Sequence, residues 1–318
     1  MSNNAVVSVA AGGAEFIISF AGLGERRGYA DTLAVTYVFD SRTRRWSEAD
    51  PVPGGVGRLA SAAASAGDLA FVFGGYTVSA DGSETSTPWV HAFDPLTGNF
   101  EERQAMPVPV DDAVAVSYSD RFIFLVSGWH DDGNVNLVQR YDTRTDSWSQ
   151  ATPTPGRGVF GHAGGIVDDT IFYCDGVAIE PGINKRRTFV ANEQCFAGTI
   201  DKTDSRRIDW RIMPPHPGAV RYRMAAAGID DLNAVVFVGG SDNPYNFDGI
   251  GYNGEPSRPA SRILRYDVEH ASWTMLSSGA AASMDHRALA YFEGEWLTVG
   301  GMLDDQRVTA GVVAYDFR

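Results

Sequence analysis

The sequence has 318 residues and a formal net charge of −14. A chain this acidic repels the phosphates of nucleic acids and of acidic membrane surfaces, so we expect neither as a partner. No segment approaches the roughly 18 consecutive apolar residues of a membrane-spanning helix. Length alone would allow two domains, although all-β chains of this size often form one.

The chain begins MSNNAVVSVAAGG. This segment has no basic region followed by the apolar run of a secretory signal peptide. We therefore expect a cytoplasmic protein. The alternative is a periplasmic protein whose signal peptide has been removed.

Six times along the chain, an apolar segment ends in a pair of small residues that includes glycine. Runs such as LAFVFGG and NAVVFVGG are rich in β-branched and aromatic residues, which is typical of a strand followed by a turn. The pairs are Ala21-Gly22, Gly74-Gly75, Ser127-Gly128, Asp175-Gly176, Gly239-Gly240 and Gly300-Gly301.

A second marker follows each pair, an aromatic or apolar residue next to Asp. These are Phe39-Asp40, Phe93-Asp94, Tyr141-Asp142, Ile200-Asp201, Tyr266-Asp267 and Tyr315-Asp316. A large aromatic comes six or nine residues after the first five, at Trp46, Phe100, Trp148, Trp210 and Trp273. Since Asp favours turns, segments such as YDTRTDSW predict hairpins between a third and a fourth strand.

Each repeat therefore predicts four antiparallel strands, of which the first is rich in small residues (SAAASAG, MAAAGID) and suits a narrow central channel. Markers that recur six times in one order, with a period near 50 residues, are the pattern of kelch repeats. We predict one all-β domain over 1–318, a six-bladed kelch-type β-propeller of four-stranded antiparallel blades. The last repeat stops after its third strand, so either that blade has three strands or Met1–Asn4 closes it weakly.

Antiparallel geometry brings two sets of loops to one mouth of the channel, those before each first strand and those after each glycine pair. Counting 16 residues back from the first residue of each pair gives Arg58, Asp111 and Arg223. Near the same height along the channel come Asp112, His162, His286 and Arg287. The loops after the glycine pairs add Arg26, Trp129, His130, Asp131, Glu180, Arg187, Asp242, Asn243, Tyr245, Asn246 and Tyr252.

These residue types suit a small polar ligand. Arg58 and Arg223 would hold a carboxylate with their bidentate donors. His130, Glu180 or His286 would transfer protons, and the other mouth residues would contact hydroxyl groups and ring faces. The alternative for the arginines is that they only pair with neighbouring acids and hold blades together.

We expect no metal and no cofactor. WHDD offers metal ligands, but no second His follows at a ligand spacing, and no glycine-rich phosphate loop leads into a helix. A copper-radical oxidase would need clustered His and Tyr ligands and a Tyr–Cys crosslink at the mouth, and we reject this class because we expect neither cysteine on a loop that faces the mouth. For the two cysteines, Cys174 and Cys195, we expect a buried inert thiol at Cys174, with a cross-strand disulfide as the alternative.

Three segments, ISFAGLG, PGGVGRLASAAASAGDLAFVFGG and DGVAIEPGINKRRTF, resemble the bacterial N-acetylneuraminate epimerases, or sialic acid mutarotases. The resemblance implies a six-bladed kelch propeller that interconverts the anomers of a sugar acid. Arg58 matches an arginine of that family. In the last segment Val177 stands where the family has Glu, while Pro181-Gly182 and Arg187-Thr188 match, so the role of that acid would pass to Glu180.

The sequence thus predicts a propeller that binds a carbohydrate or sugar acid, with cofactor-independent isomerisation by acid–base chemistry as its activity. One alternative is a non-enzymatic kelch module that binds a protein partner, and another is a tailoring enzyme of a biosynthetic pathway. A deep mouth pocket with perturbed pKa values would favour the first, and a flat apolar face the second.

Overall fold

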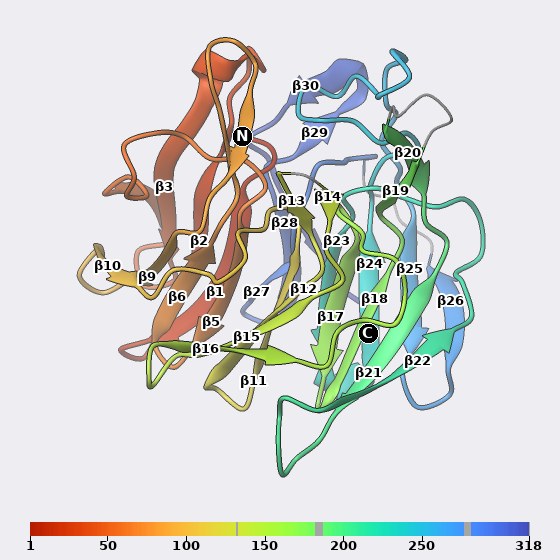
Figure 1. The fold of residues 1–318 in the computed structure, drawn as a ribbon. Coiled ribbons are helices and arrows are strands. Elements are labelled where there is room, and N and C mark those ends of the chain that lie inside the picture. Colours follow the sequence, from red (N-terminus) through yellow and green to blue (C-terminus); the bar gives the residue numbers. More distant parts are fainter. Residues whose placement is uncertain (132, 182–186, 277–280, 318) are drawn as a thin grey trace.

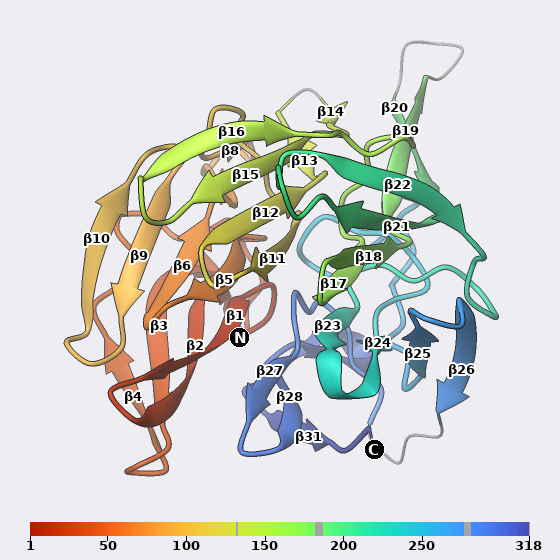
Figure 2. The ribbon, with the colours of Figure 1, turned by 90° about the horizontal axis from the view of Figure 1, so that it is seen from below.

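A computed structural model describes residues 1–131, 133–181, 187–276 and 281–317. Within them, five sheets of four antiparallel strands and a sixth of three form six blades around a centre (Figures 1 and 2). The predicted six-bladed β-propeller is thereby confirmed. Its helical segments are three short 3-10 turns over these residues. None of the described helices is long and apolar enough to cross a membrane.

Every blade runs from the centre outward in chain order. The innermost strands are β1 (Ala5–Ala11), β5 (Ala62–Ala66), β11 (Val114–Tyr118), β17 (Ala163–Val167), β23 (Ala225–Ile229) and β27 (Ala290–Phe292). The second strands are β2 (Ala14–Leu23), β6 (Leu69–Phe73), β12 (Phe122–Val126), β18 (Thr170–Cys174), β24 (Ala234–Val238) and β28 (Glu295–Val299). The third strands are β3 (Thr32–Asp40), β9 (Val90–Asp94), β15 (Val138–Asp142), β21 (Cys195–Ile200), β25 (Ile263–Asp267) and β31 (Val312–Tyr315). The outermost strands are β4 (Arg45–Ala49), β10 (Asn99–Arg103), β16 (Ser147–Ala151), β22 (Ile208–Met213) and β26 (Ser272–Leu276).

Small residues line the centre because the innermost strands crowd there. A Cβ atom on Gly165 would lie 2.2 Å from the backbone nitrogen of Gly228 in the next blade. Farther out, aromatic side chains fill the wider space between blades, as where Trp148 meets Tyr141 at 4.9 Å and Phe73 at 6.0 Å between ring centroids. The taper from alanine and glycine to tryptophan therefore follows the wedge shape of a blade.

A closed circle of backbone hydrogen bonds surrounds one end of the channel. Ahead of each innermost strand stands a residue with a left-handed φ between 52° and 66°: Asn3, Ala60, Asp112, Gly161, Arg223 and Asp285. We call these six positions the mouth ring. From Ala60 to Arg223, the N–H group of each member donates to the backbone carbonyl of the member before it, and all N···O distances around the ring are 2.8–3.4 Å. At the sixth position the N–H of His286, the residue after Asp285, donates to the carbonyl of Arg223. Asn3 then closes the circle by donating to the carbonyl of Asp285.

The sixth blade has three strands in the described residues, β27, β28 and β31. Met1–Asn4 adds no strand to its outer edge. Instead, Ser2 bridges to Leu23 of the first blade, and the carbonyl of Met1 accepts from the N–H of Gly301 in the last. The N-terminal residues thus tie the two ends of the circle together at the mouth.

The prediction of a free, inert thiol at Cys174 is wrong. Cys174 on β18 and Cys195 on β21 are direct cross-strand partners with their Cα atoms 4.2 Å apart, and they form a disulfide. The long insertion between these strands hides their register in the sequence, and only the folded sheet places the two thiols opposite each other.

Candidate functional site

Hairpins after the second strands stand above the mouth ring. They are β7 (Tyr76–Val78) with β8 (Glu84–Ser86), β13 (Trp129–His130) with β14 (Gly133–Asn134), β19 (Val177–Pro181) with β20 (Arg187–Ala191), and β29 (Met302–Leu303) with β30 (Arg307–Val308). The fifth blade has a longer loop, 241–259, closed by a bridge between Ser241 and Pro259.

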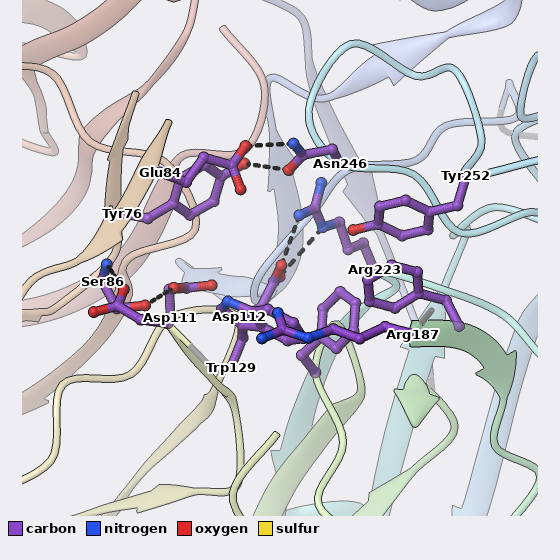
Figure 3. Close-up of a pocket in the computed structure, with 13 residues that line it drawn as sticks. Tyr76, Glu84, Ser86, Asp111, Asp112, Trp129, Arg187, Arg223, Asn246 and Tyr252 are labelled. Carbon is purple, nitrogen blue, oxygen red and sulfur yellow. Dashed lines mark hydrogen bonds and ion pairs between the residues drawn. The ribbon is translucent and has the colours of Figure 1, made fainter. Parts of the chain in front are cut away.

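Among these loops lies a pocket of about 210 Å³ (Figure 3). Side chains from the second to the fifth blade converge on it. They are Tyr76, Glu84, Ser86, Asp111, Asp112, Trp129, Asp131, Phe160, Arg187, Phe189, Arg223, Asn246 and Tyr252. We call it the mouth pocket.

A buried ion-pair network forms the floor of the mouth pocket. Arg223, only 1% exposed, donates from Nε and Nη2 to the two oxygens of Asp112 at 3.2 and 2.6 Å. Its Nη1 donates to Asp285 at 3.0 Å. Arg287 also donates to Asp112 Oδ1 and to the side-chain oxygen of Asn3. Charge-assisted bonds to both oxygens of Asp112 hold this floor in one arrangement.

Two consecutive carboxyls beside this network have opposite pKa shifts. Burial and the neighbouring charge of Asp112 raise the pKa of Asp111 well above its usual range, and Asp111 accepts a hydrogen bond from Ser86 Oγ at 2.7 Å. Burial would also raise the pKa of Asp112, but Arg223 and Arg287 outweigh it and lower that pKa. A neutral acid therefore stands next to an ionised carboxylate, the arrangement by which enzymes separate acid and base roles.

Aromatic side chains form one wall of the mouth pocket. Trp129 meets Phe160 edge to face at 5.4 Å, and Phe189 stacks on Tyr252 at 4.0 Å with their planes 18° apart. The Arg187 guanidinium lies 5.5 Å from the Trp129 ring centre. Such a wall offers flat apolar faces to a ligand ring.

Polar groups from two blades face this wall across the mouth pocket (Figure 3). The Asn246 amide donates to Glu84, and the Tyr76 hydroxyl donates to the Asn246 oxygen at 3.3 Å. The Glu84 side chain is exposed by surface area, yet the loops around it remove enough hydration to raise its pKa. The mouth pocket thus combines apolar faces with carboxyl, amide and hydroxyl groups.

Eight of the residues predicted at the mouth line the mouth pocket: Asp111, Asp112, Trp129, Asp131, Arg187, Arg223, Asn246 and Tyr252. Arg287 lies beneath its floor. Tyr245 is buried with its ring centre 5.1 Å from the Arg223 guanidinium, and burial raises its pKa well above the usual range.

Two predicted histidines lie outside the lining and are buried. His162 bonds the carbonyl of Val126 at 3.0 Å, and His286 bonds Ser283 Oγ at 2.9 Å. Burial lowers the pKa of each to about 4. Both imidazoles are therefore neutral at pH 7.

Arg58 also lies outside the lining. Its Nη1 donates to the carbonyl of Gly74 at 3.0 Å, and burial lowers its pKa to about 10. Arg58 stands two residues before the ring member Ala60, so it corresponds to Arg221 and not to Arg223. Counting 16 residues back from the glycine pair does not reach equivalent positions in the second and fifth blades. The 3-10 turn Asp230–Leu232 makes the connection between the first two strands of the fifth blade two residues longer than in the second.

The remaining predicted residues are placed away from the mouth pocket lining. Glu180 forms an exposed ion pair with Arg157 at 2.7 Å, and Arg26 pairs with Asp31 at 3.1 Å. Asp242 and Asn243 bond within their own loop, and His130 is half-buried on β13. Gly182, like Asp132 and the rest of 182–186, lies outside the described residues.

Five further lining residues were not predicted from the sequence: Tyr76, Glu84 and Ser86 of the second blade, together with Phe160 and Phe189. A usable signal was present for Tyr76, which directly follows a glycine pair as Trp129 does. Each of these two residues makes the same bridge to the loop before its innermost strand, Tyr76 to Leu59 and Trp129 to Asp111. In the described part of the chain, no three His, Cys, Asp or Glu side chains are grouped closely enough to hold a metal ion.

A search of protein families found no match for this chain. Curated proteins that it resembles include Kelch-like protein 36 of Bos taurus, 23% identical over 270 residues, which are 84% of this chain and 39% of that protein. Kelch-like protein terF of Aspergillus terreus is 30% identical over 173 residues, 50% of this chain and 34% of that protein. The chain therefore spans less than two fifths of these relatives.

The solved structure of YjhT superposes with a TM-score of 0.77 at 14% sequence identity, over 100% of this chain and 96% of that one. At this identity the likeness concerns the fold. Together with the Kelch-like relatives and the six repeats, it supports a kelch-repeat β-propeller.

Proposed function

We propose that this kelch-repeat β-propeller binds a carbohydrate or sugar acid in its mouth pocket and catalyses proton transfer to and from this ligand. The observation that carries the proposal is Asp111, a buried carboxyl with a raised pKa that lines a pocket built from four blades. The wall of Trp129, Phe160 and Phe189 suits the apolar face of a sugar ring. The carboxyl and amide groups opposite suit its hydroxyls.

The reaction that fits these groups is interconversion of anomers, which needs no cofactor. The neutral Asp111 donates a proton to the ring oxygen while Glu84, whose pKa is also raised, takes the proton from the anomeric hydroxyl. The ring C–O bond breaks and a carbonyl forms. After rotation about the bond between the carbonyl carbon and the adjacent former ring carbon, the hydroxyl attacks the other face of the carbonyl, and the reverse proton transfers close the ring and return both groups to their starting states.

Arg223, the arginine of the floor, has a structural role in this proposal and does not contact the ligand's carboxylate. Because Arg223 donates to both Asp112 and Asp285, it fixes the floor and keeps Asp112 ionised beside Asp111. We assign the contact with a sugar acid's carboxylate to Arg187, at the exposed end of the aromatic wall. The rival hypothesis, a flat apolar docking face, fits less well because Glu84, Asp111, Asp112 and Asp131 all line the mouth pocket.

A thermal-shift screen against monosaccharides and sugar acids tests binding, and NMR exchange between the anomers of a hit tests catalysis. We expect Trp129→Ala to abolish the shift. Asp111→Asn should keep the ligand-induced rise in melting temperature and slow anomer exchange by roughly 100-fold or more, which is the usual contribution of a general acid to the rate. Asp209→Asn, an exposed carboxylate on β22, is the matched control and should change neither.

The two readouts separate the two parts of the proposal. A screen in which no compound raises the melting temperature would refute binding. A hit whose anomer exchange is equally fast with Asp111→Asn and wild type would refute the acid role.

A further inference from the structure

The tryptophans of the outermost strands link neighbouring blades in a regular way. In the third, fourth and fifth blades the indole N–H donates to a backbone carbonyl of the preceding blade. Each acceptor is the residue directly after that blade's outermost strand. The bonds join Trp148 to Gln104 (2.8 Å), Trp210 to Thr152 (3.0 Å) and Trp273 to Pro214 (3.0 Å).

Trp46 occupies the same place in the first blade, but among the described residues no outermost strand of a preceding blade lies next to it. It pairs with Phe39 across β3 and β4, just as Trp148 pairs with Tyr141. The preceding blade around the circle is the sixth, which has no outermost strand in the ranges that the structure describes. Within those ranges, no acceptor hydrogen-bonds to the Trp46 indole. Its side chain is 38% exposed, whereas the other four aromatics at this position are half-buried.

A groove of about 410 Å³ lies where the sixth blade's fourth strand would run. Tyr37 and Trp46 line it from the first blade, and Val299 and Val312 line it from the sixth. Tyr37 and Val312 are 37% and 43% exposed. Beside it, β31 pairs only with β28 over the described residues, so its outer backbone groups form an open sheet edge (Figure 2).

We infer that the sixth blade, as the described part of residues 1–317 forms it, accepts an extended segment of a partner protein, which docks antiparallel to β31 and completes the blade by β-strand addition. The filled blades define the chemistry of this segment. It carries an aromatic residue opposite Tyr315, as Trp273 lies opposite Tyr266, flanked by polar residues as in SWSQA. The carbonyl after its last paired residue accepts the hydrogen bond from Trp46. This groove is separate from the mouth pocket, and the inference does not depend on the proposed reaction.

The test uses a fluorescein-labelled peptide with the sequence of residues 145–153, TDSWSQATP, which copies the third blade's outermost strand. Fluorescence anisotropy should show saturable binding to the intact protein and none for the same peptide with Ala in place of Trp. Trp46→Phe keeps the ring but loses the N–H, so it should weaken binding roughly 2- to 10-fold, as expected for one hydrogen bond. Val312→Glu places a charge in the groove and should abolish binding.

Two matched controls keep the result specific. Trp273→Phe removes the same N–H from a filled blade, and Ile212→Glu adds the same charge at an exposed apolar position on β22. Both should bind the peptide as wild type does. The inference is overturned if the peptide does not bind, or if Ile212→Glu weakens binding as much as Val312→Glu. It is also overturned if sedimentation shows a dimer that Val312→Glu dissociates, because the open edge would then pair with a second copy.

Discussion

Arg223 shows how one residue joins the backbone of the propeller to its site. Its left-handed backbone is a member of the mouth ring, and its side chain bonds Asp112 and Asp285, each at most 2% exposed. Buried carboxylates are tolerated only while a cation and hydrogen bonds compensate their lost hydration. Arg223 therefore holds together two blades that are far apart in the sequence.

Replacing this arginine should be costly. We expect Arg223→Met to lower the free energy of unfolding by about 3–5 kcal/mol, because it leaves Asp112 and Asp285 with less compensation in a buried site. Urea unfolding measures the loss. Arg206→Met, which removes an exposed pair with Asp204, is the control and should leave the free energy of unfolding nearly unchanged. Equal losses in the two variants would show that the floor network does not stabilise the fold.

At the scale of strands, the sequence predicted the blades well because their markers are local. A glycine pair and an aromatic-Asp pair sit at strand ends, where turn geometry restricts the residue type. The structure accordingly has the predicted order of strands in all six blades. A three-stranded last blade was one of the two expected outcomes.

The site was harder to predict because it depends on loop lengths and side-chain directions. Two extra residues in the turn at Asp230–Leu232 make Arg58 and Arg223 look equivalent by counting, yet only Arg223 reaches the mouth pocket. Glu180 lies on a predicted mouth loop but turns toward Arg157. The Asp111 and Asp112 side chains acquire their opposite pKa shifts only when Arg287, 175 positions after Asp112, folds against them.

The disulfide between β18 and β21 should contribute measurably to the stability of the fourth blade. It closes a loop with a sequence separation of 21, for which chain entropy gives about 3 kcal/mol. We expect the double variant Cys174→Ser and Cys195→Ser to lose about this much unfolding free energy in urea. A reducing agent should lower the stability of wild type by a similar amount and leave the double variant unchanged. Two free thiols in non-reduced protein, detected by mass spectrometry, would contradict the pairing.

At the scale of the whole molecule, the circle is closed by contacts of the N-terminal residues. Asn3 is the mouth-ring member between Asp285 and Ala60, and its side chain accepts from the Ala60 N–H at 2.8 Å. Met1 and Asn4 add contacts to Gly301 and to the carbonyl of Val299. The mouth end of the junction between the first and sixth blades thus depends on four residues that belong to no strand, whereas farther along the channel the two blades pack through residues such as Ile17 and Phe292.

Deleting residues 1–4 should therefore loosen that junction selectively. The deletion leaves the buried N–H groups of Ala60, Leu23 and Gly301 without their acceptors, at roughly 1–3 kcal/mol for each amide that stays buried. Hydrogen exchange followed by mass spectrometry should show faster exchange in β1 and β28, with β17 and β18 little changed. The substitution Asn3→Ala keeps the chain length and should give a smaller change at the same strands. Equally accelerated hydrogen exchange in all six blades would mean that the propeller opens as one cooperative unit, and that the contact between the first and sixth blades is no less stable than the others.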